Sequence, residues 1–138
     1  MDAKFLPDAE KKDANGLRSP SAPAGQRLPR RMRLVRRSEF EAVYRSGRRR
    51  ASKHFVVFGL PSALPHCRFG ISVKRTLGNA VRRNRIRRRT REILRRLRPE
   101  IQTGWDIVVH PRGPVATEDF TALYRELHAL LRELTLLR

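Results

Sequence analysis

The side chains with the clearest chemical potential lie between Lys74 and Arg98, in the run KRTLGNAVRRNRIRRRTREILRRLR. Ten of the 17 residues from Arg82 to Arg98 are arginine, against a single acid, Glu92. Guanidinium groups bind phosphate through paired hydrogen bonds and also stack on bases. Like charges one turn apart destabilise a helix, so something must offset their repulsion, and a polyanion is the natural candidate. The composition therefore indicates binding to a polyanion rather than an ordinary solvated face.

The same stretch is predicted to form a helix with one apolar stripe. Residues on one helix face recur at three- and four-residue intervals, and four residues follow that spacing: Ile86, Thr90, Ile93 and Leu97. A helical wheel places a second set on the opposite, solvent-facing side: Asn84, Arg87, Arg88, Arg91 and Arg95. Asn79 is expected to cap the helix, and Gly78 to allow a turn with positive φ.

Residues for catalysis by the protein itself are missing from the sequence. The four histidines are scattered, and no HExxH pair or Walker-type glycine loop is present. The single cysteine, Cys67, excludes a disulfide within the chain and a thiolate metal cluster. Acids are few, and strand alternation is expected to turn Asp106 toward solvent. These features argue against a nuclease centre carried by the protein.

The charge is concentrated in the middle of the chain. The formal net charge is +19, and residues 30–98 carry 23 basic and three acidic side chains. Such a charge indicates a nucleic acid or an anionic membrane as partner. The sequence has no apolar run long enough for a membrane helix and no apolar signal core. We therefore expect a soluble, cytoplasmic protein without membrane attachment.

Two parts of the chain differ in composition. Residues 1–29 are rich in proline, glycine and small residues and lack apolar periodicity, which is typical of a disordered tail. Residues 30–138 are expected to form one domain that carries the basic surface, without a requirement for a protein oligomer. Within it, Ser38 and Glu41 form a predicted capping box at the start of a short helix that ends near Gly47.

That short helix carries Phe40 and Tyr44 on one face. Aromatic residues at this spacing usually belong to a core, but the neighbouring basic residues keep a base-stacking surface open as the alternative. Phe58 poses the same question, because the alternating faces of the strand 54–60 hold Phe55 and Val57 on one side and Phe58 on the other. The residues alone do not decide between packing and stacking.

The remaining pattern predicts an α+β fold. Residues 54–60 read as a strand, residues 67–73 as its antiparallel hairpin partner, and residues 48–52 as a short strand before both. A further strand is expected at residues 105–110, followed by a helix capped by Thr117 and packed through a wide apolar stripe. The order is helix, two or three strands, helix, strand, helix, which favours a sandwich on a small mixed sheet.

The chain resembles the protein subunit of bacterial ribonuclease P over about three quarters of its length, from about Arg33 to the final helix. The resemblance is carried by Gly70-Ile71-Ser72-Val73, Leu77-Gly78-Asn79-Ala80-Val81 and Arg83-Asn84-Arg85-Ile86-Arg87-Arg88, which is similar to the Arg-Asn-Arg signature of that family. It implies an α-β-β-β-α-β-α sandwich with a left-handed βαβ crossover, as in a ribosomal-protein-like fold. Tyr44 and Arg87 depart from the family, in which Phe and Lys are common there.

The resemblance also implies a function and its residues. The protein would assist a catalytic RNA, which holds the active-site Mg²⁺ ions and removes the 5′ leader from precursor tRNA. Phe40, Tyr44 and Phe58 would line a cleft for the single-stranded leader. The catalytic RNA would be contacted by a second group, with Arg75 and Arg82 assisting: Gly78, Asn79, Arg83, Asn84, Arg85, Arg87 and Arg88.

Three other readings remain. A structural, ribosomal-type RNA-binding protein would share the basic helix without a leader cleft or a role in cleavage. A DNA-binding protein would be expected to carry Asn, Gln or Ser readers among its arginines, and only Asn84 is present. A stand-alone nuclease lacks the necessary ligands.

Overall fold

The computed structural model describes residues 29–134. Its helices and strands follow the predicted order α-β-β-β-α-β-α. Their bounds are α2 Arg37–Ser46, β1 Arg48–Ala51, β2 Phe55–Pro61, β3 Arg68–Ile71, α3 Ala80–Leu97, β4 Trp105–Pro111 and α4 Phe120–Glu133. Short 3-10 helices include η4 at Arg75–Leu77 and η6 at Gly113–Ala116. The predicted tail lies outside the described residues, except for Pro29.

The four strands form one mixed sheet in the order β1-β2-β4-β3. β2 pairs with β1 and β4 antiparallel, and β3 pairs with β4 parallel. The predicted hairpin between residues 54–60 and 67–73 is therefore wrong, because β4 lies between these two strands. Ile107, Val108 and Val109 are fully buried, so β4 needs neighbours on both edges and cover on both faces. The left hand of the β3-α3-β4 crossover stays a prediction.

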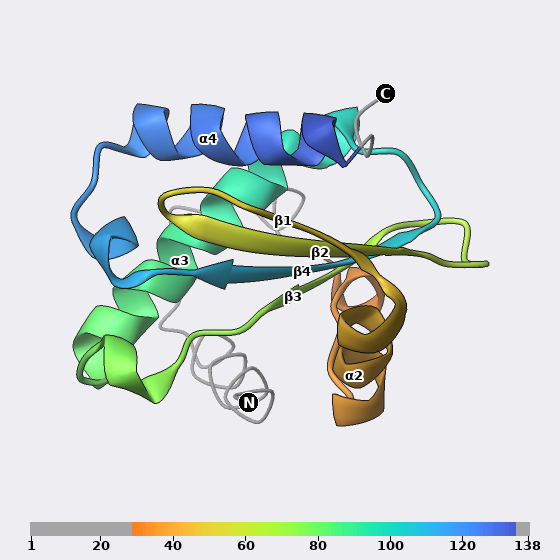
Figure 1. Cartoon of the computed structure of the whole chain (residues 1–138), viewed down its shortest axis with the longest axis horizontal. Helices are drawn as coiled ribbons and strands as arrows, with labels where there is room; N and C mark the ends of the chain where they lie inside the picture. The colour runs from red at the N-terminus through yellow and green to blue at the C-terminus, as the bar shows by residue number, and fades with distance from the viewer. Residues whose placement is uncertain (1–28, 135–138) are drawn as a thin grey trace.

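The main core lies between the sheet and the two longer helices. Figure 1 shows α4 on one face of the sheet and α2 on the other. α3 packs against α4 and connects β3 with β4. The predicted stripes of both helices are buried, including Ile86, Ile93 and Leu97 on α3 and Leu123 and Leu127 on α4. No helix within residues 29–134 is long and apolar enough to cross a membrane.

α2 docks on the opposite face through a close fit and an ion-pair network. The Phe40 ring lies so near Gly70 that a Cβ there would be 2.6 Å from Phe40 Cζ. Arg68 donates to Asp106 at 3.0 and 2.8 Å and to Glu39 Oε2 at 2.6 Å, which links β3, β4 and α2. Hydrogen bonds to Asp106 raise the pKa of Arg68. Asp106 is only 7% exposed, so the expectation that it faces solvent is wrong.

Two helix starts differ from the predicted caps. The Glu39 carboxylate accepts from the backbone N–H of Arg36 at 3.0 Å and of Val35 at 3.2 Å. α2 therefore begins at Arg37, and the predicted Ser38–Glu41 box does not form the cap. At α4, Asp119 accepts from the N–H of Ala122 at 3.0 Å. Asp119 caps this helix in place of Thr117, because α4 begins at Phe120 and Asp119 is the residue immediately before it.

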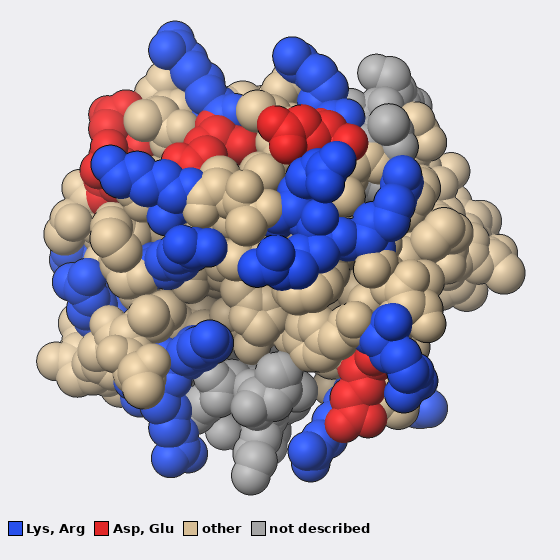
Figure 2. Space-filling view, in the orientation of Figure 1, with Lys and Arg blue, Asp and Glu red and all other residues tan. Residues whose placement is uncertain are grey.

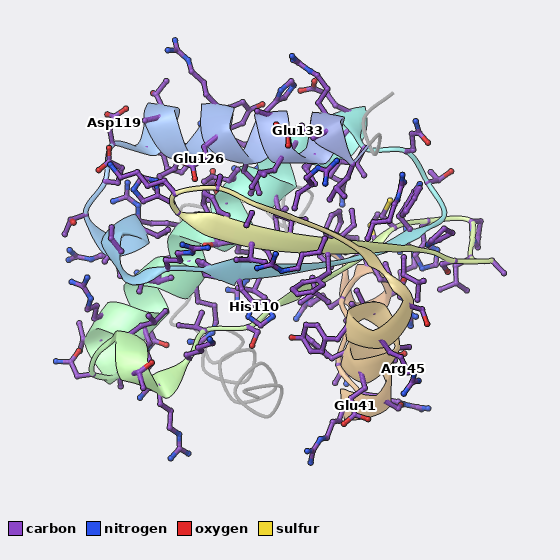
Figure 3. All side chains as sticks on the ribbon, viewed as in Figure 1. Glu41, Arg45, His110, Asp119, Glu126 and Glu133 are labelled. Carbon is purple, nitrogen blue, oxygen red and sulfur yellow. The ribbon has the colours of Figure 1, made fainter. Side chains whose placement is uncertain are left out.

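Glu126 on α4 holds the segment that precedes β2. Its carboxylate accepts from the backbone N–H of His54 at 2.6 Å, lies 2.7 Å from His54 Nδ1, and also accepts from the Ser52 hydroxyl. Figure 3 shows Glu126 on the side of α4 that faces the sheet. Burial alone would raise the pKa of Glu126, but the hydrogen bonds from Ser52 and His54 outweigh it and lower the pKa.

We expect Gly70→Ala to destabilise the fold by about 1–3 kcal/mol, because the added methyl group forces the buried Phe40 ring out of its position. Denaturant unfolding followed by circular dichroism measures the change. Gly113→Ala is the matched control, since its added Cβ would meet nothing closer than Arg82 Nη2 at 3.5 Å. Equal stability of the two variants would contradict the fit described for α2.

We expect Glu126→Gln to lower the free energy of unfolding at pH 7 by about 1–3 kcal/mol, because donors from Ser52 and His54 lose the charged acceptor. The pKa of Glu126 is lower in the folded protein, so its contribution is complete above pH ~4.5 and disappears as pH falls further. Unfolding of both proteins between pH 7 and pH 3 measures this. The exposed Glu133, 3.6 Å from Arg50, supplies the control Glu133→Gln, for which little change is expected.

Candidate nucleic-acid interface

The turn before α3 is built as the sequence predicts. Gly78 has φ 141°, a value that favours glycine. The Asn79 side chain accepts from the N–H of Arg82 at 2.9 Å and caps the helix. Arg82 turns back over Gly78, where a Cβ would lie 2.5 Å from its Cδ. Gly78 is therefore required both for its backbone conformation and for the space that Arg82 occupies.

Two arginines of the first helical turn hold the surrounding loops together. Arg82 donates to the carbonyl oxygens of Leu77 at 3.0 Å and Gly113 at 2.9 Å. Arg83 donates to the carbonyl oxygen of Gly78 at 3.1 Å. Arg75 lies just before this turn, in η4. The structure thus brings Arg75, Gly78, Asn79, Arg82 and Arg83 together at one end of α3, with Arg82 and Arg75 exposed to solvent.

The rest of the predicted arginine group divides into exposed and buried members. Arg85 and Arg88 are exposed. Arg87 is only 4% exposed and donates to Asn84 Oδ1 at 2.8 Å. The wheel's placement of Arg87 toward solvent is therefore wrong, because α3 is covered over more than its apolar stripe. Arg91, one turn later on the same side, lies close enough to Arg33 for its charge to add to burial in lowering the pKa of Arg33.

Little acid is available to offset these charges. Glu92 binds both Arg95 and Arg96, at 3.0 Å from the Nε atom of each. Its burial would raise the pKa, yet the hydrogen bonds from these two arginines lower it. Figure 2 shows basic side chains spread across the face in view, whereas the acids gather chiefly along α4. On α3 itself, Arg85 and Arg88 are exposed, so this helix adds positive charge to the surface of the molecule.

A second surface lies on the α2 side of the sheet, where three rings meet. We call Tyr44, Phe58 and His110 the aromatic patch. Ring centroids are 5.0 Å apart for Tyr44 and Phe58, 5.3 Å for Tyr44 and His110, and 5.6 Å for Phe58 and His110. All three residues are partly exposed, and Figure 3 shows His110 on this side of β4. The structure therefore presents Tyr44 and Phe58 together, as the resemblance implies.

Phe40 does not belong to the exposed part of this patch. Its side chain is 0% exposed and lies against Gly70 and Leu34. Its ring is 6.5 Å from that of Tyr44. This burial contradicts the expectation that Phe40 presents its ring to a bound strand, and it answers the open question for this residue in favour of packing. Phe40 instead supports the helix that carries Tyr44.

Two residues on the aromatic-patch side of the sheet were not predicted from the sequence: His110 and Arg49. In the antiparallel ladders, Arg49 pairs with Phe58, and His110 pairs with Val56 two residues earlier on the same face of β2. Directly paired residues point to the same face, so both lie on the side of the aromatic patch. Alternation along residues 105–111 separates His110 from Val109, but only the position of β4 beside β2 brings it to Phe58.

The aromatic patch and the exposed arginines are side chains of the kinds that bind nucleic acid. Aromatic faces beside guanidinium groups are the usual components of a surface for single-stranded nucleic acid. Mg²⁺ requires several oxygen ligands, mostly carboxylates in protein sites. Among residues 29–134, no three His, Cys, Asp or Glu side chains gather to hold a metal ion. The described residues therefore do not fit a protein-borne Mg²⁺ site.

Comparisons with known proteins point to one family. A family model described as Ribonuclease P matches residues 28–135. The ribonuclease P protein component of Oleidesulfovibrio alaskensis is 41% identical over 111 residues, which cover 78% of this chain and 89% of that protein. The same component of Thermotoga petrophila is 38% identical over 109 residues, covering 76% and 93%.

Solved structures agree with these relatives. The RNase P protein from Staphylococcus aureus superimposes with a TM-score of 0.70 at 30% identity, covering 78% of this chain and 98% of that one. The RNase P protein from Thermotoga maritima gives a TM-score of 0.67 at 36% identity, covering 73% and 96%. The similarity therefore extends to sequence and fold over nearly the whole length of each relative.

Proposed function

This chain belongs to the ribonuclease P protein family, and we propose that within the ribonucleoprotein it binds both the catalytic RNA and the 5′ leader of precursor tRNA. As a protein component of ribonuclease P, it takes part in tRNA processing within an endoribonuclease complex. Its RNA partner is ribonuclease P RNA.

One observation carries the proposal: Arg75, Arg82 and Arg83 at the start of α3 lie at the same end of the sheet as the aromatic patch. β3 and β4 are parallel, so their carboxyl ends lie at the same edge of the sheet. The carboxyl end of β3 leads into η4 and the start of α3. The carboxyl end of β4 carries His110 and is followed by Gly113. The Gly113 carbonyl accepts from Arg82, only three residues along the chain from the aromatic patch. A single RNA-binding surface can thus extend from the rings to the guanidiniums.

The aromatic patch is the proposed leader site. A base stacked on an aromatic side chain contributes about 1–3 kcal/mol with little dependence on sequence, which suits a subunit that accepts many leaders. Tyr44 and Phe58 are the stacking residues, with Phe40 holding α2 in place. Arg49, exposed and paired with Phe58 across β1 and β2, supplies a charge for the leader phosphates.

The start of α3 is the proposed contact with the catalytic RNA. Arg85 and Arg88 bind phosphates directly, and Gly78 and Asn79 shape the turn that presents Arg75, Arg82 and Arg83. Arg87 holds Asn84 through its hydrogen bond to Oδ1. We assign hydrolysis and the Mg²⁺ ions to the RNA, since the described residues offer no fitting set of metal ligands. The protein acts in the cytoplasm, where these RNAs are made.

The decisive experiment is cleavage of a precursor tRNA by a bacterial ribonuclease P RNA at low Mg²⁺, with and without this protein. We expect cleavage at the mature 5′ end only when the protein is present. Binding of the RNA without any promotion of cleavage would favour a structural RNA-binding protein. Cleavage by a protein preparation shown to be free of RNA would overturn the assignment of catalysis.

The leader site is tested by Phe58→Ala in the reconstituted holoenzyme. We expect a loss of about 1–3 kcal/mol in affinity for a precursor with a long leader, and no loss for tRNA without a leader. Tyr124→Ala is the matched control, because Tyr124 is a partly exposed aromatic residue on α4, stacked with His128. Equal losses for both RNAs would contradict the leader site.

The arginine surface is tested by salt dependence. Each phosphate neutralised by a cation releases counterions and steepens the fall of affinity with salt. We expect Arg85→Gln and Arg88→Gln each to reduce the slope of log affinity against log salt for ribonuclease P RNA by about 1. Arg125→Gln removes an exposed charge on α4, outside the proposed RNA-binding surface, and is expected to leave the slope unchanged. If all three variants reduced the slope equally, the loss would reflect the net charge of the protein and not a contact made by α3.

A further inference from the structure

One basic run of the sequence belongs to neither of the surfaces described above. Residues 30–37 (RRMRLVRR) hold five arginines and no acid. We call these residues the N-terminal arginine segment. Four of its arginines are exposed, namely Arg30, Arg31, Arg36 and Arg37, and Arg33 is partly exposed. Such a density of positive charge, away from the start of α3, indicates a further contact with a polyanion.

The backbone of this segment is fixed to the outer edge of the sheet. β3 is an outer strand, and its Phe69 carbonyl oxygen accepts from the N–H of Leu34 at 2.7 Å. The Leu34 side chain is only 2% exposed. The Glu39 carboxylate accepts from the N–H groups of Val35 and Arg36. The arginines therefore stand on a fixed backbone, so a partner that binds them has to order only their side chains.

The segment lies against the second half of α3. Arg98 Nη1 is 3.6 Å from Met32 Sδ. Burial lowers the pKa of Arg33, and the positive charge of the nearby Arg91 lowers it further. The fold thus brings together two arginine-rich stretches that are far apart in the chain. Like charges held close to each other repel, and a bound anion offsets that repulsion.

The acids that lie nearest in the chain have other partners. Glu39 binds Arg68 across to β3 at 2.6 Å. Glu41 lies 3.2 Å from Arg37 Nε, in a pair exposed to solvent, which is worth little. Glu92 on α3 binds two arginines of its own helix. The N-terminal arginine segment therefore keeps a strong net positive charge in the folded protein.

The two ends of α3 are too far apart to bind the same phosphate. At 1.5 Å per residue, Arg91 lies about 14 Å and Arg98 about 24 Å along the helix axis from Arg82. The screening length at physiological salt is about 8 Å. The segment is also remote from the aromatic patch, because β4 and β3 lie between β2 and the segment, a separation of about 14 Å in strand spacings.

We propose that the N-terminal arginine segment and the second half of α3 form a second phosphate-binding surface, which contacts ribonuclease P RNA at a place separate from the contact made by the start of α3. This inference rests on the proposed function and adds a surface to it. The partner is the sugar–phosphate backbone of a folded RNA, which guanidinium groups bind through paired hydrogen bonds. Two contacts at opposite ends of one rigid helix hold two parts of the RNA at a fixed distance.

The first test measures the affinity of the full chain for ribonuclease P RNA over a series of salt concentrations, without tRNA. We expect Arg31→Gln and Arg36→Gln each to reduce the slope of log affinity against log salt by about 1, because each removes a phosphate contact. Arg125→Gln removes an exposed charge on α4 and is the matched control, with no change expected. Arg31→Gln combined with Arg85→Gln is expected to reduce the slope by about 2, since the two side chains bind different phosphates.

The second test locates the contacts by protection of the RNA backbone from hydroxyl radicals. We expect two separate protected regions with the unchanged protein. The double variant Arg31→Gln/Arg36→Gln is expected to lose protection in one region, and Arg85→Gln/Arg88→Gln in the other. Thermal unfolding of each variant verifies that the fold is intact.

Two outcomes overturn the inference. One is loss of protection at the same nucleotides in both double variants, which means a single contact. The other is unchanged affinity of Arg31→Gln and Arg36→Gln for the RNA alone; if these variants then weaken tRNA binding by the holoenzyme, the segment binds tRNA instead. Failure of the proposed function gives a different result, because the unchanged protein then binds ribonuclease P RNA no better than an unrelated RNA of equal length and does not promote cleavage.

Discussion

The parallel pairing of β3 with β4 is the constraint on which the rest of the structure depends. It places the carboxyl ends of both strands at one edge of the sheet, where the chain enters α3 and where β4 leads into η6. α3 must then begin beside Gly113, whose carbonyl oxygen accepts a hydrogen bond from Arg82. β4 also pairs with β2 on its other edge, which brings His110 to Phe58. One strand thus positions both surfaces that the proposed function uses.

A helix this rich in arginine folds because its guanidiniums are used as hydrogen-bond donors within the structure. Arg82 and Arg83 bind backbone carbonyls of the preceding turn. Arg89 donates to carbonyl oxygens of Ala116 and Glu118 and so ties α3 to the segment before α4. Five donors in a fixed plane allow arginine to do this, whereas lysine offers only a point charge. Packing of the apolar stripe then opposes the repulsion that remains.

Sequence patterns were sufficient for features that depend on neighbours along the chain. Asn79 caps α3, Gly78 has a positive φ, and the apolar stripes of α3 and α4 are buried. Sequence patterns were insufficient where elements that are distant along the chain pack against each other. Asp106 alternates toward a face that Arg68 and Glu39 cover, and Arg87 is buried although the wheel places it toward solvent. A wheel or an alternation rule describes one element in isolation, so it cannot show which of its polar faces another element covers.

The same limit explains why Phe40 and Tyr44 on α2 differ in burial although their spacing suggests one role. Spacing of four residues places Phe40 and Tyr44 on one helix face, which suggests one shared role. The helix lies across the sheet, however, so successive turns meet different strands. Phe40 meets β3 at Gly70, where the missing side chain leaves room for a buried ring. Tyr44, one turn later, meets β2 and β4 at Phe58 and His110 and stays partly exposed. Burial of the first ring fixes the helix and so sets the position of the second, which is the ring that remains available to a ligand.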